Sequence, residues 1–113
     1  MPSDNFSAVT PSGLTNGNGK LIAAIASPGD VIHTCDTTLR DEVYIWVCNL
    51  STITVDFYLE VGNLVYTHPI PNDGDLHLIR PGTRHTGGTV IRAYAETTNV
   101  LVVDAIVNRI SPA

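Results

Sequence analysis

The chain has 113 residues, 43% of them hydrophobic and 15% charged, a composition that excludes an intrinsically disordered chain and a second independent core. The charged share lies below the about 25% typical of soluble domains, so we expect part of the surface to contact other protein. Six basic residues against eleven acidic ones give a net charge of −5, the wrong sign for binding phosphates, so no nucleic-acid partner is expected.

Residues 1–19 differ from the rest of the chain, being rich in Ser, Asn, Gly, Thr and Pro. They lack the basic and apolar regions of a secretory signal, and no apolar run reaches the about 18 residues of a membrane span, so we expect neither that export route nor membrane insertion. Phe6, Val9 and Leu14 are isolated apolar residues along this segment. We expect an extended N-terminal arm that lies along its own domain or on a neighbouring subunit, with these three residues as partner-binding anchors.

Residues 20–113 form the expected folded domain. Val, Ile and Thr dominate there while straight-chain helix formers are few, which favours strands, and no segment predicts a helix. Eight short runs separated by turn residues at spacings of about ten residues predict an all-β antiparallel β-sandwich or jelly-roll-like barrel. The expected strands are residues 21–27, 31–35, 42–49, 53–61, 64–70, 76–79, 89–97 and 100–110.

The turns between these strands carry their own signals. Gly62 and Asn63 between two apolar runs predict a two-residue hairpin loop, and Thr98 and Asn99 are expected to close a second hairpin. Residues 80–88 are expected to form a long loop.

Strict alternation over residues 53–61, with apolar odd positions and mostly polar even ones, predicts one core face and one wet face.

Two strands are apolar on both faces. At 42–49, Tyr44, Trp46 and Cys48 alternate with valine and isoleucine, and the strand at 100–110 repeats the pattern with Val100 and Val102. The second face needs a cover, which is a loop, the arm or another chain. We expect an oligomer whose interface includes Tyr44, Trp46, Val100 and Val102.

Three soft ligands fall on neighbouring expected strands. His33 and Cys35 share a face of one strand and Cys48 lies on the next, a combination that resembles part of a zinc site. Because a fourth ligand is missing, we expect two buried thiols and a hydrogen-bonded histidine instead. A Cys35–Cys48 disulfide, formed after release into an oxidising medium, stays open as an alternative.

No other motif predicts chemistry. The run Asn72-Asp73-Gly74-Asp75 has carboxylates but no Glu at calcium-loop spacing, so it is expected to be a turn. No motif places a Ser, a His and an acid together for nucleophilic catalysis. We expect a protein that is not an enzyme and holds no cofactor or metal.

Most of the positive charge lies close together in the sequence. Arg80, Arg84 and His85 fall in the expected long loop and Arg92 in the strand after it. The three arginines are expected to bind an acidic partner surface through bidentate contacts, with a solvated surface as the alternative.

A short resemblance covers residues 75–85, with the sequence DLHLIRPGTRH. It resembles the second half of a cupin, in which a P-G-x-x-H turn supplies a metal-binding histidine, here His85. Cupins also carry an upstream H-x-H, and residues 44–49 contain no histidine. A cupin-type metal-binding protein is therefore the less favoured alternative.

A longer resemblance runs from about residue 25 to residue 110. In the order of its turns and strands the chain is similar to small all-β virion proteins of tailed bacteriophages. The matching segments are Pro28-Gly29-Asp30, VCNLST at 47–52, TVDFYL at 54–59, Arg80-Pro81-Gly82, IRAYA at 91–95, TTN at 97–99 and the closing strand at 101–110.

This resemblance implies a non-enzymatic capsid decoration, or cement, protein, made in the host cytoplasm and located on the capsid surface of the virion. Its partner is expected to be the major capsid protein, which it binds as a homotrimer at subunit junctions, stabilising the expanded shell by mass action and by many repeated contacts. The alternative from another class is a receptor- or glycan-binding module of a phage tail or fibre.

Overall fold

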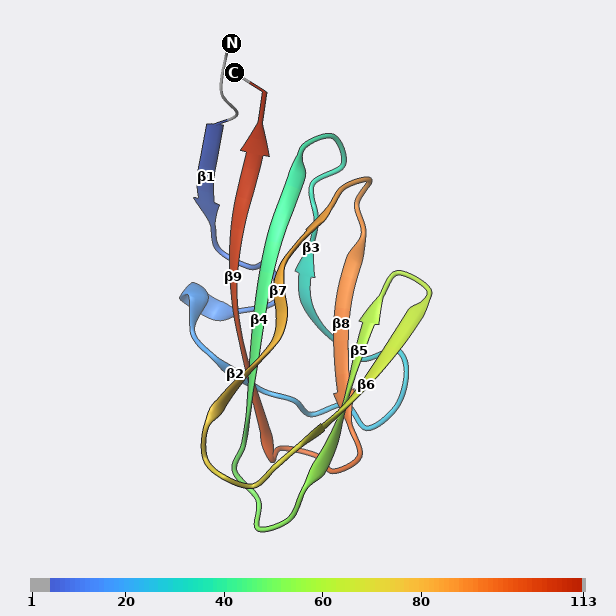
Figure 1. Ribbon diagram of the computed structural model, residues 1–113. Helices are drawn as coiled ribbons and strands as arrows, with labels where there is room; N and C mark the ends of the chain where they lie inside the picture. Colours follow the sequence, from blue (N-terminus) through green and yellow to red (C-terminus); the bar gives the residue numbers. More distant parts are fainter. Residues whose placement is uncertain (1–4, 113) are drawn as a thin grey trace.

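Two antiparallel sheets form the fold in the computed structural model, which describes residues 5–112 (Figure 1). Within these residues almost all of the regular secondary structure is strand, so the predicted all-β sandwich is confirmed. The elements are β1 (Asn5–Val9), η1, a 3-10 turn (Thr15–Gly17), β2 (Lys20–Leu21), β3 (Asp30–Thr34), β4 (Arg40–Asn49), β5 (Val55–Val61), β6 (Leu64–Ile70), β7 (Leu76–His85), β8 (Val90–Ala95) and β9 (Leu101–Ser111).

Most neighbouring strands within each sheet are far apart in the sequence. The five-stranded sheet has the order β1-β9-β4-β7, with β2 also paired to β9, and the four-stranded sheet has the order β3-β8-β5-β6. Within the described residues, neighbouring strands of both sheets pair antiparallel. Leaving out the short β2, this order is that of two interlocked Greek keys, the topology of a jelly roll.

The core lies between the two sheets. The inward-facing side chains of β4 and β5, among them Val43, Ile45, Phe57 and Leu59, are fully buried. They alternate along each strand with side chains that point outward, because successive side chains of a strand point to opposite faces. The inward phase predicted for both strands is therefore the observed one.

The first predicted strand is wrong over most of its length. Only Lys20–Leu21 forms a strand with β9, and after Ile22, whose N–H donates to the carbonyl of Leu101 at 2.9 Å, the chain leaves β9. The side chain of Asp30 explains the change, because its Oδ2 accepts hydrogen bonds from the backbone N–H groups of Ala23 (2.8 Å) and Ala24 (3.3 Å). These N–H groups are thus satisfied by a carboxylate in place of a neighbouring strand.

The turn at 98–99 does not close a hairpin. It connects β8 to β9, which lie in different sheets, so it carries the chain across the sandwich. Asn99 has a φ of 57°, in the left-handed region that asparagine tolerates better than most residues. The hairpin predicted at Gly62 and Asn63 is confirmed, since Val61 and Leu64 face each other across it.

The predicted long loop at 80–88 is mostly strand. β7 continues to His85 and pairs with β4, with shifts in register between Val43 and Tyr44 and between Ile45 and Trp46. Gly82 sits at one of these shifts with a φ of 83°, and a Cβ there would lie 2.8 Å from Cζ of Tyr44. The bulged strand therefore needs glycine at this position, both for its backbone and for the ring beside it.

The strand predicted at 53–61 begins later and is less wet than expected. Ile53 is 64% exposed and precedes β5, because the side chain of Asn49 holds a turn by donating to the carbonyl of Ile53. On the even face, Glu60 is buried and accepts hydrogen bonds from the Ser27 hydroxyl and the Gly29 N–H, each at 2.6 Å. The wet face thus holds one buried carboxylate.

The predicted arm lies against its own domain wherever it is described. β1 pairs with β9, and Gly13 donates to the carbonyl of Ile32 at 2.8 Å. A Cβ at Gly13 would lie 1.8 Å from the carbonyl oxygen of Val31, so the backbones touch there. Residues 1–4 of the predicted arm, and Ala113, lie outside the described residues.

Candidate functional site

The outward side of the five-stranded sheet carries an apolar surface, here called the outer face. The cross-strand register places its residues side by side, with Tyr44 opposite Ile106, Trp46 between Leu78 and Asp104, and Leu21 next to Val102. The outer face consists of Leu21, Tyr44, Trp46, Cys48, Leu76, Leu78, Val102, Asp104 and Ile106.

The outer face is open to solvent in the single chain. Leu21, Leu76, Leu78 and Ile106 are 45%, 51%, 50% and 52% exposed. Contiguous apolar patches of this kind are rare on soluble monomers and mark contact with another molecule.

The predicted interface residues are only partly brought together. Tyr44, Trp46 and Val102 all lie on the outer face, where the rings of Tyr44 and Trp46 have centroids 6.0 Å apart and planes inclined by 14°. Val100 does not join them, because it packs against the core. The alternation that pointed to Val102 fails at Val100, which precedes β9.

Charges on and beside the outer face are few. Asp104 sits opposite Trp46 and accepts a hydrogen bond from the N–H of Ala105 at 2.9 Å. At the far end Arg84 Nε donates to Glu42 at 3.2 Å and the Tyr44 hydroxyl donates to the same carboxylate at 3.1 Å. Burial opposes ionisation of Glu42, but these hydrogen bonds outweigh it and lower its pKa.

A second apolar surface lies at the β5–β6 hairpin. Leu64 and Tyr66, here called the hairpin overhang, are 61% and 39% exposed. Val65 between them pairs with Glu60 and points to the opposite side of the sheet. The register pairs Leu64 with Val61 and Tyr66 with Leu59, so both point to the inner side of their sheet. The hairpin tip lies on the side of the molecule away from β1 and β9, so the inner side of β6 is left uncovered there (Figure 1).

Arg80 borders the hairpin overhang. Its guanidinium carbon lies 4.5 Å from the ring centroid of Tyr66, a cation–π contact. Among the described residues no acceptor bonds its buried Nε. Burial, helped by the charge of Arg80, lowers the pKa of both His68 and His85.

The predicted basic cluster is not assembled. Arg80 and Arg84 lie on β7 with opposite facing, since Arg80 pairs with buried Ile45 and Arg84 with Glu42, while Arg92 lies on β8 in the other sheet. The expectation of one basic loop was wrong because residues 80–85 continue a strand, and the extra residue at the Gly82 bulge turns Arg80 and Arg84 to opposite faces. No single docking surface holds all three arginines.

The predicted arm anchors also differ from one another. Phe6 is 58% exposed on β1, whereas Val9 packs against the core and Leu14 is 4% exposed within it. Leu14 is therefore corrected from a partner-binding anchor to a core residue, because residues 11–14 lie across β3. Phe6 alone of the three offers a free apolar side chain.

A buried polar network links the two sheets. Nε2 of His33 on β3 lies 2.7 Å from Oδ2 of Asp41 on β4, and Arg109 of β9 donates to both oxygens of Asp41, at 2.8 and 3.0 Å. The N–H of Ser12 donates to Nδ1 of His33 at 3.1 Å. These partners assign the neutral tautomer that carries its proton on Nε2.

The network sets the charge states of its members. Burial acts to raise the pKa of Asp41, but hydrogen bonds from Arg109 and His33 outweigh it and lower that pKa. Cys35 lies beside the network, and burial together with the negative charge of Asp41 raises its pKa to about 11. The Cys35 thiol is therefore protonated at neutral pH.

The three soft ligands noted in the sequence are not brought together. Ligand atoms of His33, Cys35 and Asp41 lie within 4.8 Å of one another, whereas Cys48 is on the outer face. Both oxygens of Asp41 are already bonded, the cation beside them is Arg109, and the thiol is protonated. His33 is hydrogen-bonded and Cys35 is buried, as expected, but Cys48 is only half-buried, and both cysteines are free thiols.

Sequence reasoning missed Asp41 and Arg109. Each follows the inward phase of its strand, Asp41 with Val43 and Ile45, and Arg109 with Val107. A charged residue in the apolar phase of a strand is the signal that was available, since a charge is buried only with a partner. Two opposite charges in such positions predict an internal ion pair.

The other candidate sites carry less. His85 accepts or donates a hydrogen bond with Thr83 at 3.0 Å and is not part of the close ligand group. In the predicted turn at 72–75, Asp73 bonds His77 at 2.9 Å and the N–H of Asp75 at 3.0 Å, which is turn chemistry. Neither region brings together a set of metal ligands among the described residues.

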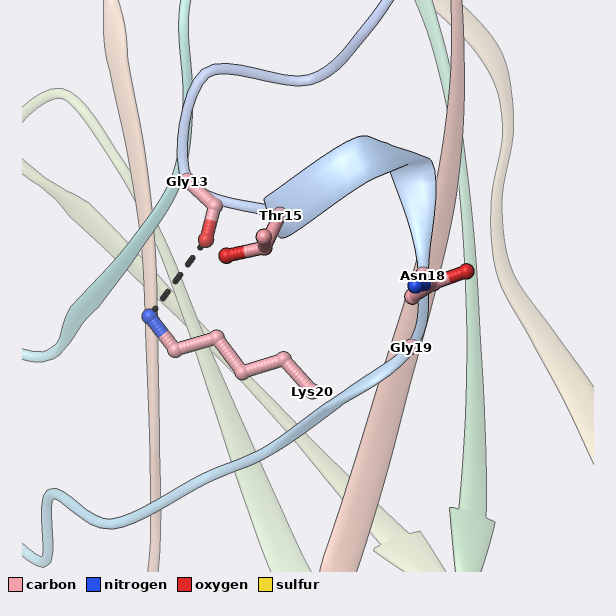
Figure 2. A pocket seen from close by; sticks show the side chains of 5 residues that line it. All are labelled: Gly13, Thr15, Asn18, Gly19 and Lys20. Atoms are coloured by element: carbon pink, nitrogen blue, oxygen red, sulfur yellow. Dashed lines mark hydrogen bonds between the residues drawn. The ribbon is translucent and has the colours of Figure 1, made fainter.

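A cavity of about 300 Å³ lies in the loop before β2 (Figure 2). Lys20 extends across it and Nζ donates to the carbonyl of Gly13 at 3.5 Å, while the Thr15 hydroxyl points into the same space and Asn18 points away. The cavity offers one cation that already contacts a carbonyl. It contains no pair of groups that could carry out acid–base or nucleophilic chemistry.

Comparisons of the chain with protein-family models, curated proteins and solved structures gave no match. Among the described residues, no helix has the length and hydropathy that a membrane crossing requires.

Proposed function

We propose that the chain is a non-enzymatic structural protein of a tailed-bacteriophage virion, a capsid decoration protein that binds the major capsid protein as a homotrimer. The sequence resemblance suggests this role, and the all-β sandwich is compatible with it. The proposal places the protein on the outer shell, where it stabilises the expanded state by binding that state preferentially.

The observation that carries the proposal is the apolar outer face. A sheet with an apolar inner side needs the core of its own domain, but an apolar outward side is useful only when another molecule covers it. Tyr44, Trp46 and Ile106 lie on this outward side, where the two aromatic side chains are half-buried and Ile106 is open to solvent. A protein that works by assembly requires such a surface.

The polar residues support the non-enzymatic part of the proposal. His33, Asp41 and Arg109 use their hydrogen-bonding groups on one another inside the fold. A catalytic group must reach a substrate, and these side chains are held between the sheets. Their arrangement favours a structural role.

Cosedimentation tests the proposed function. The purified chain is mixed with expanded shells assembled from the major capsid protein of the same virus, and with unexpanded shells as the control. We expect a fixed number of copies to pellet with expanded shells and to raise their melting temperature. Absence of the chain from both pellets would overturn the proposal.

Glycan binding is the second candidate function, favoured by the near-parallel rings of Tyr44 and Trp46 beside Asp104 and Glu42. Flat aromatic rings with carboxylates nearby can pack against sugar rings and accept their hydroxyl hydrogen bonds. A glycan array separates the two candidates. Binding that disappears in Trp46→Ala, together with no binding to shells, would favour the glycan-binding module.

A further inference from the structure

Two apolar surfaces stay uncovered in the single chain, and they lie in different sheets. The outer face belongs to β9, β4 and β7, and the hairpin overhang belongs to β6. A contact that uses the same surface on both copies would cover only one of them. Contact between two different surfaces of neighbouring copies covers both.

The charges beside the two surfaces are complementary. The outer face carries Asp104, which forms no ion pair among the described residues, and Arg80 of β7 borders the hairpin overhang over the ring of Tyr66. Apolar side chains flank both charges, Ile106 near Asp104 and Leu64 beside Tyr66, and His68 and His85 also lie close enough to Arg80 to feel its charge. An acid in one apolar surface and a cation in the other give the contact a specific register.

We propose that the outer face of one copy packs against the hairpin overhang of the next copy, with Asp104 paired to Arg80 across the contact. This inference rests on the proposed function, because it names the contact that would build the proposed homotrimer. Head-to-tail contacts of this kind form a ring when the rotation between copies closes, and the proposed homotrimer requires closure after three copies.

Single substitutions at solvent-exposed positions test the contact. Leu78→Asp places a charge in the outer face and Leu64→Asp places one in the hairpin overhang, and both positions are open enough to tolerate the change in the single chain. Ile25→Asp is the matched control, since Ile25 is 63% exposed and belongs to neither surface. Sedimentation velocity should show a trimer for the wild type and Ile25→Asp, and a monomer for the other two.

Mixing the two defective variants gives the decisive result. Leu64→Asp retains an intact outer face and Leu78→Asp retains an intact hairpin overhang, so one good contact can form between them. We expect the mixture to contain a heterodimer that neither variant gives alone. If Leu64→Asp associates like the wild type while Leu78→Asp is monomeric, the contact joins two outer faces and the proposal is overturned.

A charge exchange tests the pairing itself. Asp104→Arg and Arg80→Asp should each weaken the trimer at least tenfold, because each places like charges together, and the double variant should recover most of the loss. No recovery would overturn the pairing of these two residues. A wild-type chain that is monomeric, or that forms open-ended polymers, would overturn the ring. The proposed function is tested separately, by the binding of that same chain to expanded shells.

Discussion

His33 and Asp41 form a hydrogen bond of 2.7 Å between the two sheets, and both side chains are almost completely buried. Arg109 completes the charge balance from β9 at 2.8 Å. A buried carboxylate with a cation on one side and an imidazole N–H on the other is stable only as a complete set. The network therefore fixes how β3 packs on β4 and β9.

Replacing Asp41 should destabilise the fold strongly. Asp41→Ala leaves Arg109 without its counterion and His33 without its acceptor, and breaking a buried pair in this way costs about 3 kcal/mol. Urea unfolding followed by tryptophan fluorescence measures the loss. Asp73→Ala is the control, because it removes an exposed His77 partner and should leave the midpoint nearly unchanged. Equal effects of the two variants would show that the network contributes little.

Acid should destabilise the protein through the same carboxylate. The pKa of Asp41 in the folded state is below its ordinary value, so its stabilisation is fully present above the unfolded pKa of about 3.9 and is lost as the pH falls through the folded value. The pKa of Asp36 is lowered too, because the backbone N–H groups of Leu39 and Thr38 donate hydrogen bonds to its carboxylate.

The expected outcome is a fall in the free energy of unfolding below about pH 4, where carboxylates with lowered pKa values take up protons on unfolding. Urea titrations from pH 7 to pH 3 measure it. In Asp41→Ala the fall should be clearly smaller than in the wild type. An unchanged pH dependence in the variant would mean that other carboxylates govern acid unfolding.

The sequence predicts the fold class well because alternation is a local signal. Val43, Ile45 and Val47 have the period of a strand, and their burial follows from that period. The two-residue hairpin at Gly62 is local in the same sense. Strand bounds failed where a polar side chain nearby in the sequence bonded the backbone in place of a neighbouring strand, as Asp30 does at Ala23 and Asn49 does at Ile53.

The surfaces are less predictable because they depend on strand pairing. Tyr44 and Trp46 are two residues apart, so their common face was evident, but the placement of Leu76 and Leu78 beside them follows only from the β4–β7 register. The hairpin overhang depends on how far one sheet extends past the other. Such long-range placement leaves no periodic trace in the sequence.

Side-chain substitutions in the N-terminal segment should show that its two parts contribute differently to stability. Leu14 is buried in the core, so Leu14→Ala should cost about 3 kcal/mol, in the range found for cavities left by leucine. Phe6→Ala, on exposed β1, should change stability little and is the matched control. Thermal unfolding of both variants gives the comparison. A small effect of Leu14→Ala would restore the view of residues 1–19 as a detachable arm.

The two cysteines should differ sharply in reactivity with a thiol reagent. Cys35 is buried and its pKa is raised to about 11, so at pH 8 almost none of it is the reactive thiolate. Cys48 is half-buried on the outer face, with its thiol 3.5 Å from the carbonyl of Gly74.

Labelling of dilute native protein at pH 8 should modify one thiol, and Cys48→Ser should abolish that reaction. Both thiols should react after unfolding in urea. Rapid labelling of Cys35 in the native Cys48→Ser variant would contradict the burial of this thiol beside Asp41. A Cys35–Cys48 disulfide is not expected, because the structure places one cysteine inside the sandwich and the other on its outer face. If neither cysteine reacted in unfolded, unreduced wild type, that disulfide would be present and this placement would be wrong.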